Sequence, residues 1–172
     1  TTDFTGSFTV QDGVSGSESR LLAQNISALG SGTSALNLSG AYDSLEINQT
    51  SAADLSRLIS GAGYLVKSGA DNLTLSAANS FSGGTKLNVG TITLGNDSAL
   101  GTGQVNLALN TVLESGSAAR ALQNHVEITD NATLRANNLF TIGKSNLANS
   151  SSVNVVAGKT LNLNANTGDF IF

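Results

Sequence analysis

The sequence predicts an all-β protein that folds as a right-handed parallel β-helix, a solenoid with about 20 residues per coil. Three observations support this fold class. Short blocks of alternating apolar and polar residues recur along the chain, equivalent blocks recur at a near-constant interval, and none of the 172 residues is proline. Because each proline removes one hydrogen bond from a β-ladder, its absence suits a chain built from stacked strands.

Each block has the alternation of a strand with one buried face and one face in solvent. In Leu45-Glu46-Ile47, for example, two apolar residues flank a charged one. The blocks lie at residues 36–38, 45–47, 65–66, 73–75, 87–89, 92–94, 105–107, 112–113, 126–128, 134–136, 153–155 and 161–163. Isolated strands of this length do not form a stable sheet, so we expect the blocks to stack.

Every second block recurs after about 20 residues, which is the interval of a solenoid coil. One run contains Leu45, Leu65 and Leu87, and another contains Leu73, Ile92, Val112 and Leu134. Two or three strands per coil, paired in parallel with their equivalents, satisfy the backbone at ~4.8 Å per coil. Parallel crossovers are right-handed in nearly all sheets, which predicts the hand of the winding. About eight coils would make a rod roughly 40 Å long.

The chain is predicted to be a single β-helix segment over residues 1–172, with two diverged repeat units at about 1–60 and 61–136 and further coils to 172. Residues 3–7 resemble residues 80–84, and residues 25–32 align with 96–103. Two stretches break the strand pattern. Residues 52–59 have helical spacing and predict a single helical turn or a bulged loop, and residues 137–152 are irregular. The apolar C-terminus at 169–172 either packs onto a further coil or covers the last one.

The composition excludes several classes of protein. Charged residues make up 12% and hydrophobic residues 40%, which argues against both a disordered chain and a helical bundle. The absence of cysteine excludes a disulfide framework. The net charge of −4 is scattered without a basic patch, so we expect no nucleic-acid binding, and no apolar run is long enough for direct membrane insertion. The missing initiator methionine and signal-peptide pattern predict an internal start within a longer protein.

An ordered series of landmarks lies between residues 59 and 103. It contains G-x-L-x-K-x-G, L-T-L, N-x-F-S-G-G-T, G-T-I-x-L-G and A-L-G-x-G. This series resembles the passenger-associated repeat of bacterial autotransporters. The residues of this structural motif are Gly61, Gly63, Leu65, Lys67, Gly69, Leu73, Leu75, Asn79, Phe81, Gly83, Gly84, Thr85, Gly90, Leu94, Gly95, Ala99, Leu100, Gly101 and Gly103.

The resemblance implies a passenger that is exported by type V secretion and displayed at the bacterial cell surface or released. Its implied partners are the rest of its own passenger and a C-terminal β-barrel, together with a host-cell surface or another copy of itself. Such passengers serve adhesion, aggregation or virulence. The regular coils at residues 61–114 further predict a folding nucleus, or autochaperone, for secretion across the outer membrane.

No constellation of residues predicts catalysis. His125, the only histidine, shares a strand face with Glu127, but the sequence shows no nucleophile or oxyanion donors beside them. Ser98 follows Asp97 in Asn-Asp-Ser-Ala rather than in the Gly-Asp-Ser-Gly motif of serine-protease passengers, and we interpret it as a turn residue. The alternative function is a carbohydrate-active β-helix enzyme (lyase or hydrolase), but the twelve acidic residues are scattered rather than paired, which argues against it.

Metal and sugar attachment have weak support in the sequence. The single Gly-Gly lacks the aspartate of calcium-binding β-roll repeats, which leaves only a lone ion at Asp12 or Asp97 as a metal hypothesis. Asn-x-Ser/Thr sequons begin at Asn25, Asn48, Asn72 and Asn131, among other positions, and we interpret these asparagines as corner residues. We therefore expect no catalytic residue, cofactor or metal.

Overall fold

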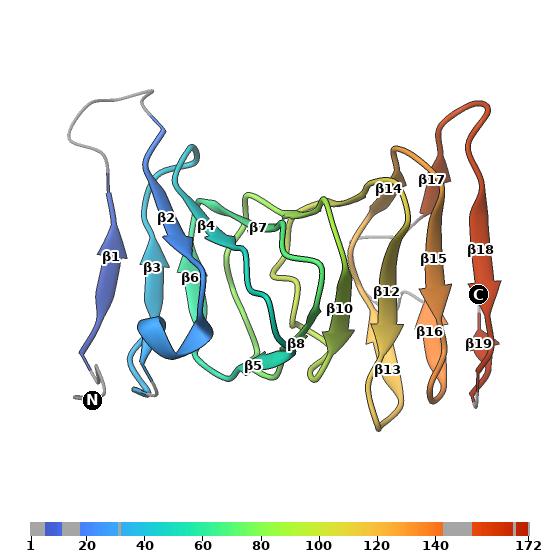
Figure 1. Cartoon of the computed structure of the whole chain (residues 1–172), viewed down its shortest axis with the longest axis horizontal. Helices are drawn as coiled ribbons and strands as arrows, with labels where there is room; N and C mark the ends of the chain where they lie inside the picture. Colours follow the sequence, from blue (N-terminus) through green and yellow to red (C-terminus); the bar gives the residue numbers. More distant parts are fainter. Residues whose placement is uncertain (1–5, 12–17, 31, 143–152, 167, 172) are drawn as a thin grey trace.

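The structure, a computed structural model, describes residues 6–11, 18–30, 32–142, 153–166 and 168–171. Its strands stack along one axis from the N-terminal to the C-terminal end (Figure 1). All strand pairs in this part of the chain are parallel. Equivalent strands lie about 21 residues apart over about 6 turns, which confirms the predicted parallel β-helix.

Two long sheets form two faces of the rod. The seven-stranded sheet has the order β17-β14-β11-β9-β7-β4-β2, and the six-stranded sheet has the order β18-β15-β12-β10-β8-β5. The strands of the first are β2 (Arg20–Ala23), β4 (Ser44–Ile47), β7 (Tyr64–Lys67), β9 (Thr85–Leu87), β11 (Val105–Leu107), β14 (Val126–Ile128) and β17 (Val153–Val155). Those of the second are β5 (Ala53–Leu55), β8 (Asn72–Leu75), β10 (Thr91–Leu94), β12 (Thr111–Ser115), β15 (Ala132–Arg135) and β18 (Leu161–Asn164).

The third face of the rod has regular strands only toward its two ends. One three-stranded sheet contains β1 (Phe8–Val10), β3 (Leu36–Leu38) and β6 (Ile59–Gly61), and the other contains β13 (Arg120–Leu122), β16 (Phe140–Ile142) and β19 (Phe170–Ile171). Between them, two coils continue the face through backbone hydrogen bonds outside regular strands, one of which runs from Ser80 N to Ile59 O at 2.9 Å. Ser82 N donates to Gly61 O at 3.0 Å, and Thr102 N donates to Phe81 O at 2.9 Å.

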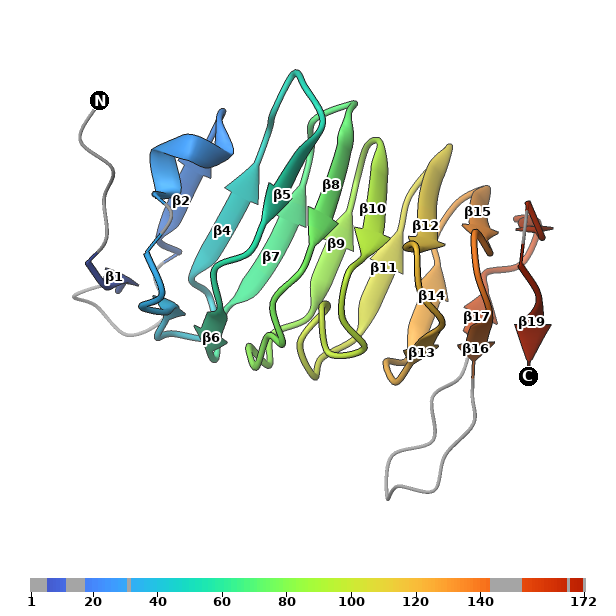
Figure 2. The ribbon, with the colours of Figure 1, turned by 90° about the horizontal axis from the view of Figure 1, so that it is seen from below.

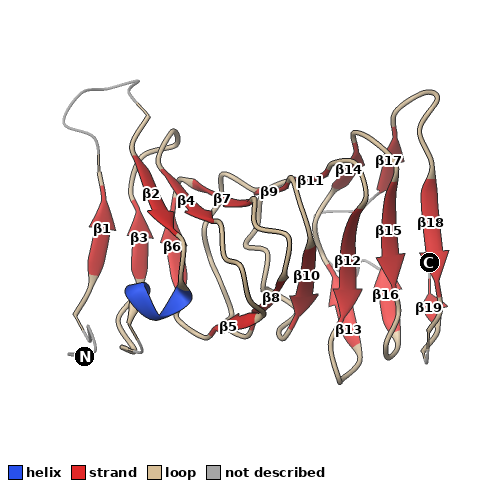
Figure 3. Ribbon diagram, viewed as in Figure 1, coloured by secondary structure: helices blue, strands red, loops and turns tan. Residues whose placement is uncertain are grey.

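The winding is right-handed. In Figure 2 the strands of the six-stranded sheet lie in front and run downward, while those of the seven-stranded sheet lie behind and run upward. Figure 3 shows that strands and loops make up almost the whole fold, with one short helix beside β2.

Alternate side chains of every strand point into one continuous apolar core. The inward residues Leu45 and Leu65 pair across neighbouring coils, and both are completely buried. On the six-stranded sheet, the same holds for Leu73 and Ile92. Each coil alone would leave its inward face exposed, so the stability of one coil depends on its neighbours.

All twelve predicted blocks contain residues of a strand, but the structure has further strands that the alternation did not indicate. They are β1, β2, β5, β6, β13, β16 and β19. The predicted helical turn or loop at residues 52–59 is wrong, since β5 forms there and β6 begins at Ile59. The predicted irregular stretch at 137–152 contains β16, and its residues 143–152 lie outside the described part of the chain.

The blocks expected to be equivalent do lie in neighbouring strands, but the residue-to-residue register differs at two positions. Leu65 pairs with Thr85 rather than with Leu87, which instead lies opposite Lys67. On the six-stranded sheet, Ile92 pairs with Leu113 rather than Val112. Because side chains alternate between faces, this slip of one residue places Val112 on the outer face.

The predicted number of about eight coils is too high. Central coils are regular, since Thr85 pairs with Val105 after 20 residues. Near the two ends the interval is longer: Phe8 pairs with Leu36 and Val126 with Val153, after 28 and 27 residues. The turns near the ends therefore contain more residues each, so the same chain length makes fewer turns.

A short 3-10 helix, η1 (Ile26–Leu29), lies against β5 at the edge of the six-stranded sheet. Asn25 Oδ1 accepts from Ser27 N at 2.9 Å, and Gly30 N donates to Ser27 O at 3.1 Å. The segment that begins at Asn96 has the same pattern, with 2.9 Å from Ser98 N to Asn96 Oδ1. The two turns follow strands of different sheets, β2 and β10, so the division into two repeat units remains a prediction.

Candidate functional site

The apolar landmarks of the repeat motif lie inside the rod. Leu65, Leu73, Leu75, Phe81, Leu94, Ala99 and Leu100 are each at most 1% exposed. They come from β7, β8, β10 and the two irregular segments of the third face. The motif therefore records which side chains fill the core between neighbouring coils.

The glycine landmarks lie at corners and strand ends where a neighbouring coil passes too closely for a side chain. At Gly61, whose φ is +102°, a Cβ would lie 2.0 Å from Leu38 O. At Gly101, with φ of +67°, it would lie 2.3 Å from Phe81 O. The same close approach to the backbone of a neighbouring coil occurs at Gly63, Gly69, Gly83, Gly84, Gly90, Gly95 and Gly103. The glycine pattern thus maintains the spacing of the coils.

Two buried asparagines tie the corners of successive coils together. Asn79 Oδ1 accepts from Ile59 N at 2.8 Å, while its Nδ2 donates to Ala99 O at 2.6 Å. Asn124 Nδ2 donates to Gly101 O and Gly103 O at 3.1 and 2.8 Å. Each side chain satisfies backbone groups that would otherwise be buried without partners.

Lys67 occupies an inward position of β7, opposite Ile47 and Leu87 in the neighbouring strands, and it is 0% exposed. Its Nζ donates to Gly69 O and, at 3.5 Å, to Val89 O. Burial lowers the pKa of Lys67 from 10.5 to about 8, and the nearby charge of Asp71 opposes this shift. The motif thus places an amino group in the apolar core, where it contacts two consecutive coils.

The threonine landmark, Thr85, also points inward and is 1% exposed. Its hydroxyl donates to Leu100 O at 3.3 Å. All motif residues therefore act on packing, corner geometry or internal hydrogen bonding, and the outer faces remain available for other roles.

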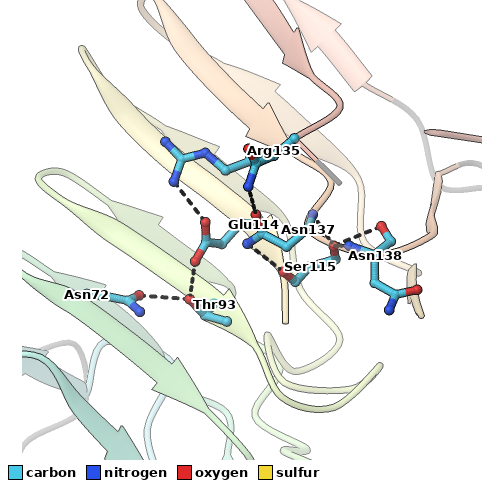
Figure 4. A network of polar contacts seen from close by, with 8 residues as sticks. Asn72, Thr93, Glu114, Ser115, Arg135, Asn137 and Asn138 are labelled. Carbon is cyan, nitrogen blue, oxygen red and sulfur yellow. Dashed lines mark hydrogen bonds and ion pairs between the residues drawn. The ribbon is translucent and has the colours of Figure 1, made fainter. Parts of the chain in front are cut away.

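The outer face of the six-stranded sheet carries a polar ladder formed by Asn72, Thr93, Glu114 and Arg135 (Figure 4). Thr93 Oγ1 lies 2.9 Å from Asn72 Oδ1 and 2.6 Å from Glu114 Oε1. Arg135 Nη1 donates to Glu114 Oε2 at 3.0 Å. This ladder links four consecutive coils through side chains.

Ser115 extends this ladder to the next corner. Its buried hydroxyl donates to Asn138 O at 3.1 Å and accepts from the backbone N of Asn137 and Asn138 at 3.0 and 3.1 Å (Figure 4). The backbone of the following coil is therefore held by one serine side chain.

The seven-stranded sheet carries a second set of charges. Glu46 accepts from Ser68 Oγ and Arg20 Nη1, each at 2.6 Å. The Ser68 hydrogen bond is the main cause that lowers the pKa of Glu46, and Arg20 adds to it. Further along this face, Lys86 Nζ lies 4.2 Å from the centre of the Tyr64 ring.

The candidate catalytic residues of the sequence lie on these outer surfaces. His125 and Glu127 share a face at the start of β14, and Glu127 Oε2 accepts from Gln104 Nε2 at 2.7 Å. Ser98 lies in the turn capped by Asn96. Asp97 Oδ1 accepts from Ala121 N at 3.1 Å.

Within the described residues, no group of three or more His, Cys, Asp or Glu side chains is arranged to hold a metal ion. Asp12, one of the two positions considered for a lone ion, lies outside that part of the chain. No helix of the described ranges has the length and apolar character needed to span a membrane.

The sequence did not point to Arg57, which is 2% exposed. Its guanidinium donates to Ser34 O at 2.8 and 3.1 Å, to Gly6 O at 2.6 Å and to Leu29 O at the end of η1. Its position within an apolar stretch between Leu55 and Ile59 was a signal for burial, but its partners are separated from it by more than 20 residues.

Residues 65–94 match the family model of the Passenger-associated-transport-repeat, which confirms the resemblance in this segment. No curated protein and no solved structure matched the chain. The repeat and the β-solenoid fit a segment of an autotransporter passenger. The repeat is one of secreted or surface-displayed proteins.

Proposed function

We propose that the chain is a non-catalytic segment of an autotransporter passenger, a stalk for adhesion or virulence functions at the bacterial surface and a folding nucleus (autochaperone) for secretion. The observation that carries this proposal is that every residue of the repeat motif serves stacking. Apolar landmarks fill the core, and glycine landmarks lie where neighbouring backbones leave no room for a Cβ.

The nucleus hypothesis is supported by the regularity of the matched segment. Over β7, β9 and β11 the interval between paired residues is 20, without the long excursions found nearer the ends. In a linear stack, folding can begin at one set of coils and propagate to its neighbours. Regular coils with buried corner bonds, such as those of Asn79, are suited to start that process.

The adhesion hypothesis is supported by the composition of the outer faces. One row of outward residues crosses five successive coils of the six-stranded sheet. It contains Asn72, Thr91, Val112, Thr133 and Asn162, so all of its members except Val112 are polar. Hydroxyl and amide groups in such rows bind partners through direct and water-mediated hydrogen bonds that are individually weak and add along the rod. A host-cell surface or a second passenger would be the partner.

Two in-register deletions in the full-length passenger separate these roles. Deletion of residues 65–84 joins Tyr64 to Thr85 and removes one coil that carries the motif, because Leu65 pairs with Thr85. The matched control, deletion of residues 105–125, removes one coil outside the matched repeat, because Val105 pairs with Val126. Protease-resistant passenger at the cell surface and adhesion are measured for both.

If the segment is a folding nucleus, the first deletion lowers protease-resistant display severalfold and the control does not. Equal display from both variants would refute the nucleus role. Intact display with reduced adhesion would assign binding to the outer faces. Turnover of an acidic polysaccharide by the purified chain would overturn the non-catalytic proposal.

A further inference from the structure

Two long polar side chains enter one corner of the rod, where the seven-stranded sheet turns into the six-stranded sheet. Lys67 ends β7 and points inward, opposite Ile47 of the preceding coil. Two residues further along each coil, Gln49 lies beside Gly69, since a Cβ on Gly69 would lie 2.3 Å from Gln49 O. The side chains of Gln49 and Lys67 therefore come from consecutive coils to the same corner.

Both side chains lie inside the rod. Gln49 is 2% and Lys67 0% exposed. Asn48 is exposed, so the alternation of side chains places Gln49 inward, on the same side as Ile47. Because Gly69 has no side chain, the inward space beside Gln49 on the next coil is left to the Lys67 ammonium, whose Nζ donates to Gly69 O.

Protein atoms satisfy these two side chains only in part. Gln49 Nε2 donates to Asn72 O at 2.9 Å, but Gln49 Oε1 has no hydrogen-bond partner within the described ranges of the chain. The Lys67 ammonium has three N–H groups, and its two acceptors are Gly69 O and, at 3.5 Å, Val89 O. One buried corner thus holds an unpaired acceptor and a donor group with capacity left, whereas buried polar groups are nearly always paired.

The chemistry of the two groups restricts what can lie between them. An occupant has to accept a hydrogen bond from Lys67 Nζ and donate one to Gln49 Oε1. A metal cation is repelled by the ammonium and accepts no hydrogen bond, and a halide ion has no proton to donate to a carbonyl oxygen. Water does both, and two polar partners are enough to hold a water molecule inside a protein.

We propose that this corner is a binding site for one internal water molecule, which accepts from Lys67 Nζ and donates to Gln49 Oε1. The water gives the ammonium a third partner and satisfies the amide oxygen of the preceding coil. Lys67 and Gly69 are both landmarks of the repeat motif, so the site gives them a common role: the lysine supplies the donor, and the glycine leaves the room. This inference is independent of the proposed function, because a stalk and a folding nucleus can both contain an internal water.

The test is a pair of high-resolution crystal structures, of the 172-residue chain and of its Gln49→Met variant. In the wild type, one ordered water should lie within hydrogen-bond distance of both Gln49 Oε1 and Lys67 Nζ. Gln49→Met has a side chain of similar length without the amide, and it should lose this water. A direct hydrogen bond between the two side chains, an ion or no density between them, or a water that persists in the variant would overturn the proposal.

A double-mutant cycle in solution tests the bridge by urea unfolding of Gln49→Met, Lys67→Met and the double variant. Loss of the Gln49 amide should lower the folding equilibrium constant at least fivefold less in the Lys67→Met background, because no ammonium then depends on the water. The matched control replaces Lys67→Met by Lys86→Met, since Lys86 is exposed on the outer face of β9, and its effect should be independent of Gln49. Independent effects of Gln49→Met and Lys67→Met would also overturn the proposal.

Discussion

Lys67 gives the sharpest test of how this fold is stabilised, because it places a titratable amino group in the core. The pKa of Lys67 is lowered from 10.5 to about 8 in the folded chain. Between these values the unfolded chain binds more protons than the folded one, so the free energy of unfolding rises with pH. Below pH 8 both states are charged, and the folded state carries the full penalty of burying the ammonium.

The size of the effect follows from the shift. Each pKa unit corresponds to 1.36 kcal/mol, so the free energy of unfolding should gain about 2–3 kcal/mol from Lys67 between pH 7 and pH 10. Lys67→Met keeps an unbranched side chain that is one atom shorter, and it removes the titration. The expected result is therefore that the stability difference between wild type and variant changes by about that amount between the two pH values.

The assay is urea unfolding followed by circular dichroism at pH 7 and pH 10 for both proteins. Lys86→Met provides the control, because it makes the same exchange at an exposed lysine of β9. A wild-type-to-variant difference that is the same at both pH values would show that the Lys67 ammonium is not held in an apolar environment, and would refute the reasoning.

Three further perturbations test the other internal contacts by urea unfolding. Asn79→Ala leaves the backbone groups of Ile59 and Ala99 without partners and should lower the free energy of unfolding by about 2–4 kcal/mol; a loss below about 1 kcal/mol would contradict this role. Gly61→Ala should cost more than about 3 kcal/mol because its Cβ meets Leu38 O, whereas Gly158→Ala, with φ of +79° and nothing within 4 Å, should cost only about 1 kcal/mol; equal losses would show that backbone angle alone decides. Glu46→Gln should destabilise by about 0.5–1 kcal/mol at pH 7. Because the pKa of Glu46 is lowered in the folded chain, this difference should vanish as the pH falls through that pKa, and persistence in acid would refute its electrostatic origin.

The fold class could be predicted from the sequence for two reasons. Strand geometry sets the alternation of apolar and polar residues, and the length of one coil sets the interval between equivalent blocks. Blocks such as Val105–Leu107 and Val126–Ile128 became strands with the predicted bounds. Most strands of the third face were missed, although β3 was among the predicted blocks. In Ile59–Gly61, for example, the outward and inward residues do not contrast, and the stack supplies the pairing. The slip at Val112 has a similar cause, because two adjacent apolar residues leave the register open until the neighbouring strand selects Leu113.

The candidate site was also predicted only in part. Motif residues were identified from their order along the chain, and the match at residues 65–94 agrees with that identification. The polar ladder was not predicted, because Thr93, Glu114 and Arg135 are more than 20 residues apart and meet only through the exact length of each coil. Arg57 was missed for the same reason. Which side chains meet between neighbouring coils depends on the exact number of residues in each coil. Local sequence patterns do not give that number.

The direction of the ladders has a mechanical consequence. Backbone hydrogen bonds between coils run parallel to the rod axis, since every strand lies across that axis and pairs with its neighbours along it (Figure 1). A force that pulls the two ends of the rod apart would therefore load the three ladders of one coil at a time and peel coils in sequence. Such a rod extends in steps of one coil, about 21 residues each, and re-forms by winding the released chain back onto the remaining stack.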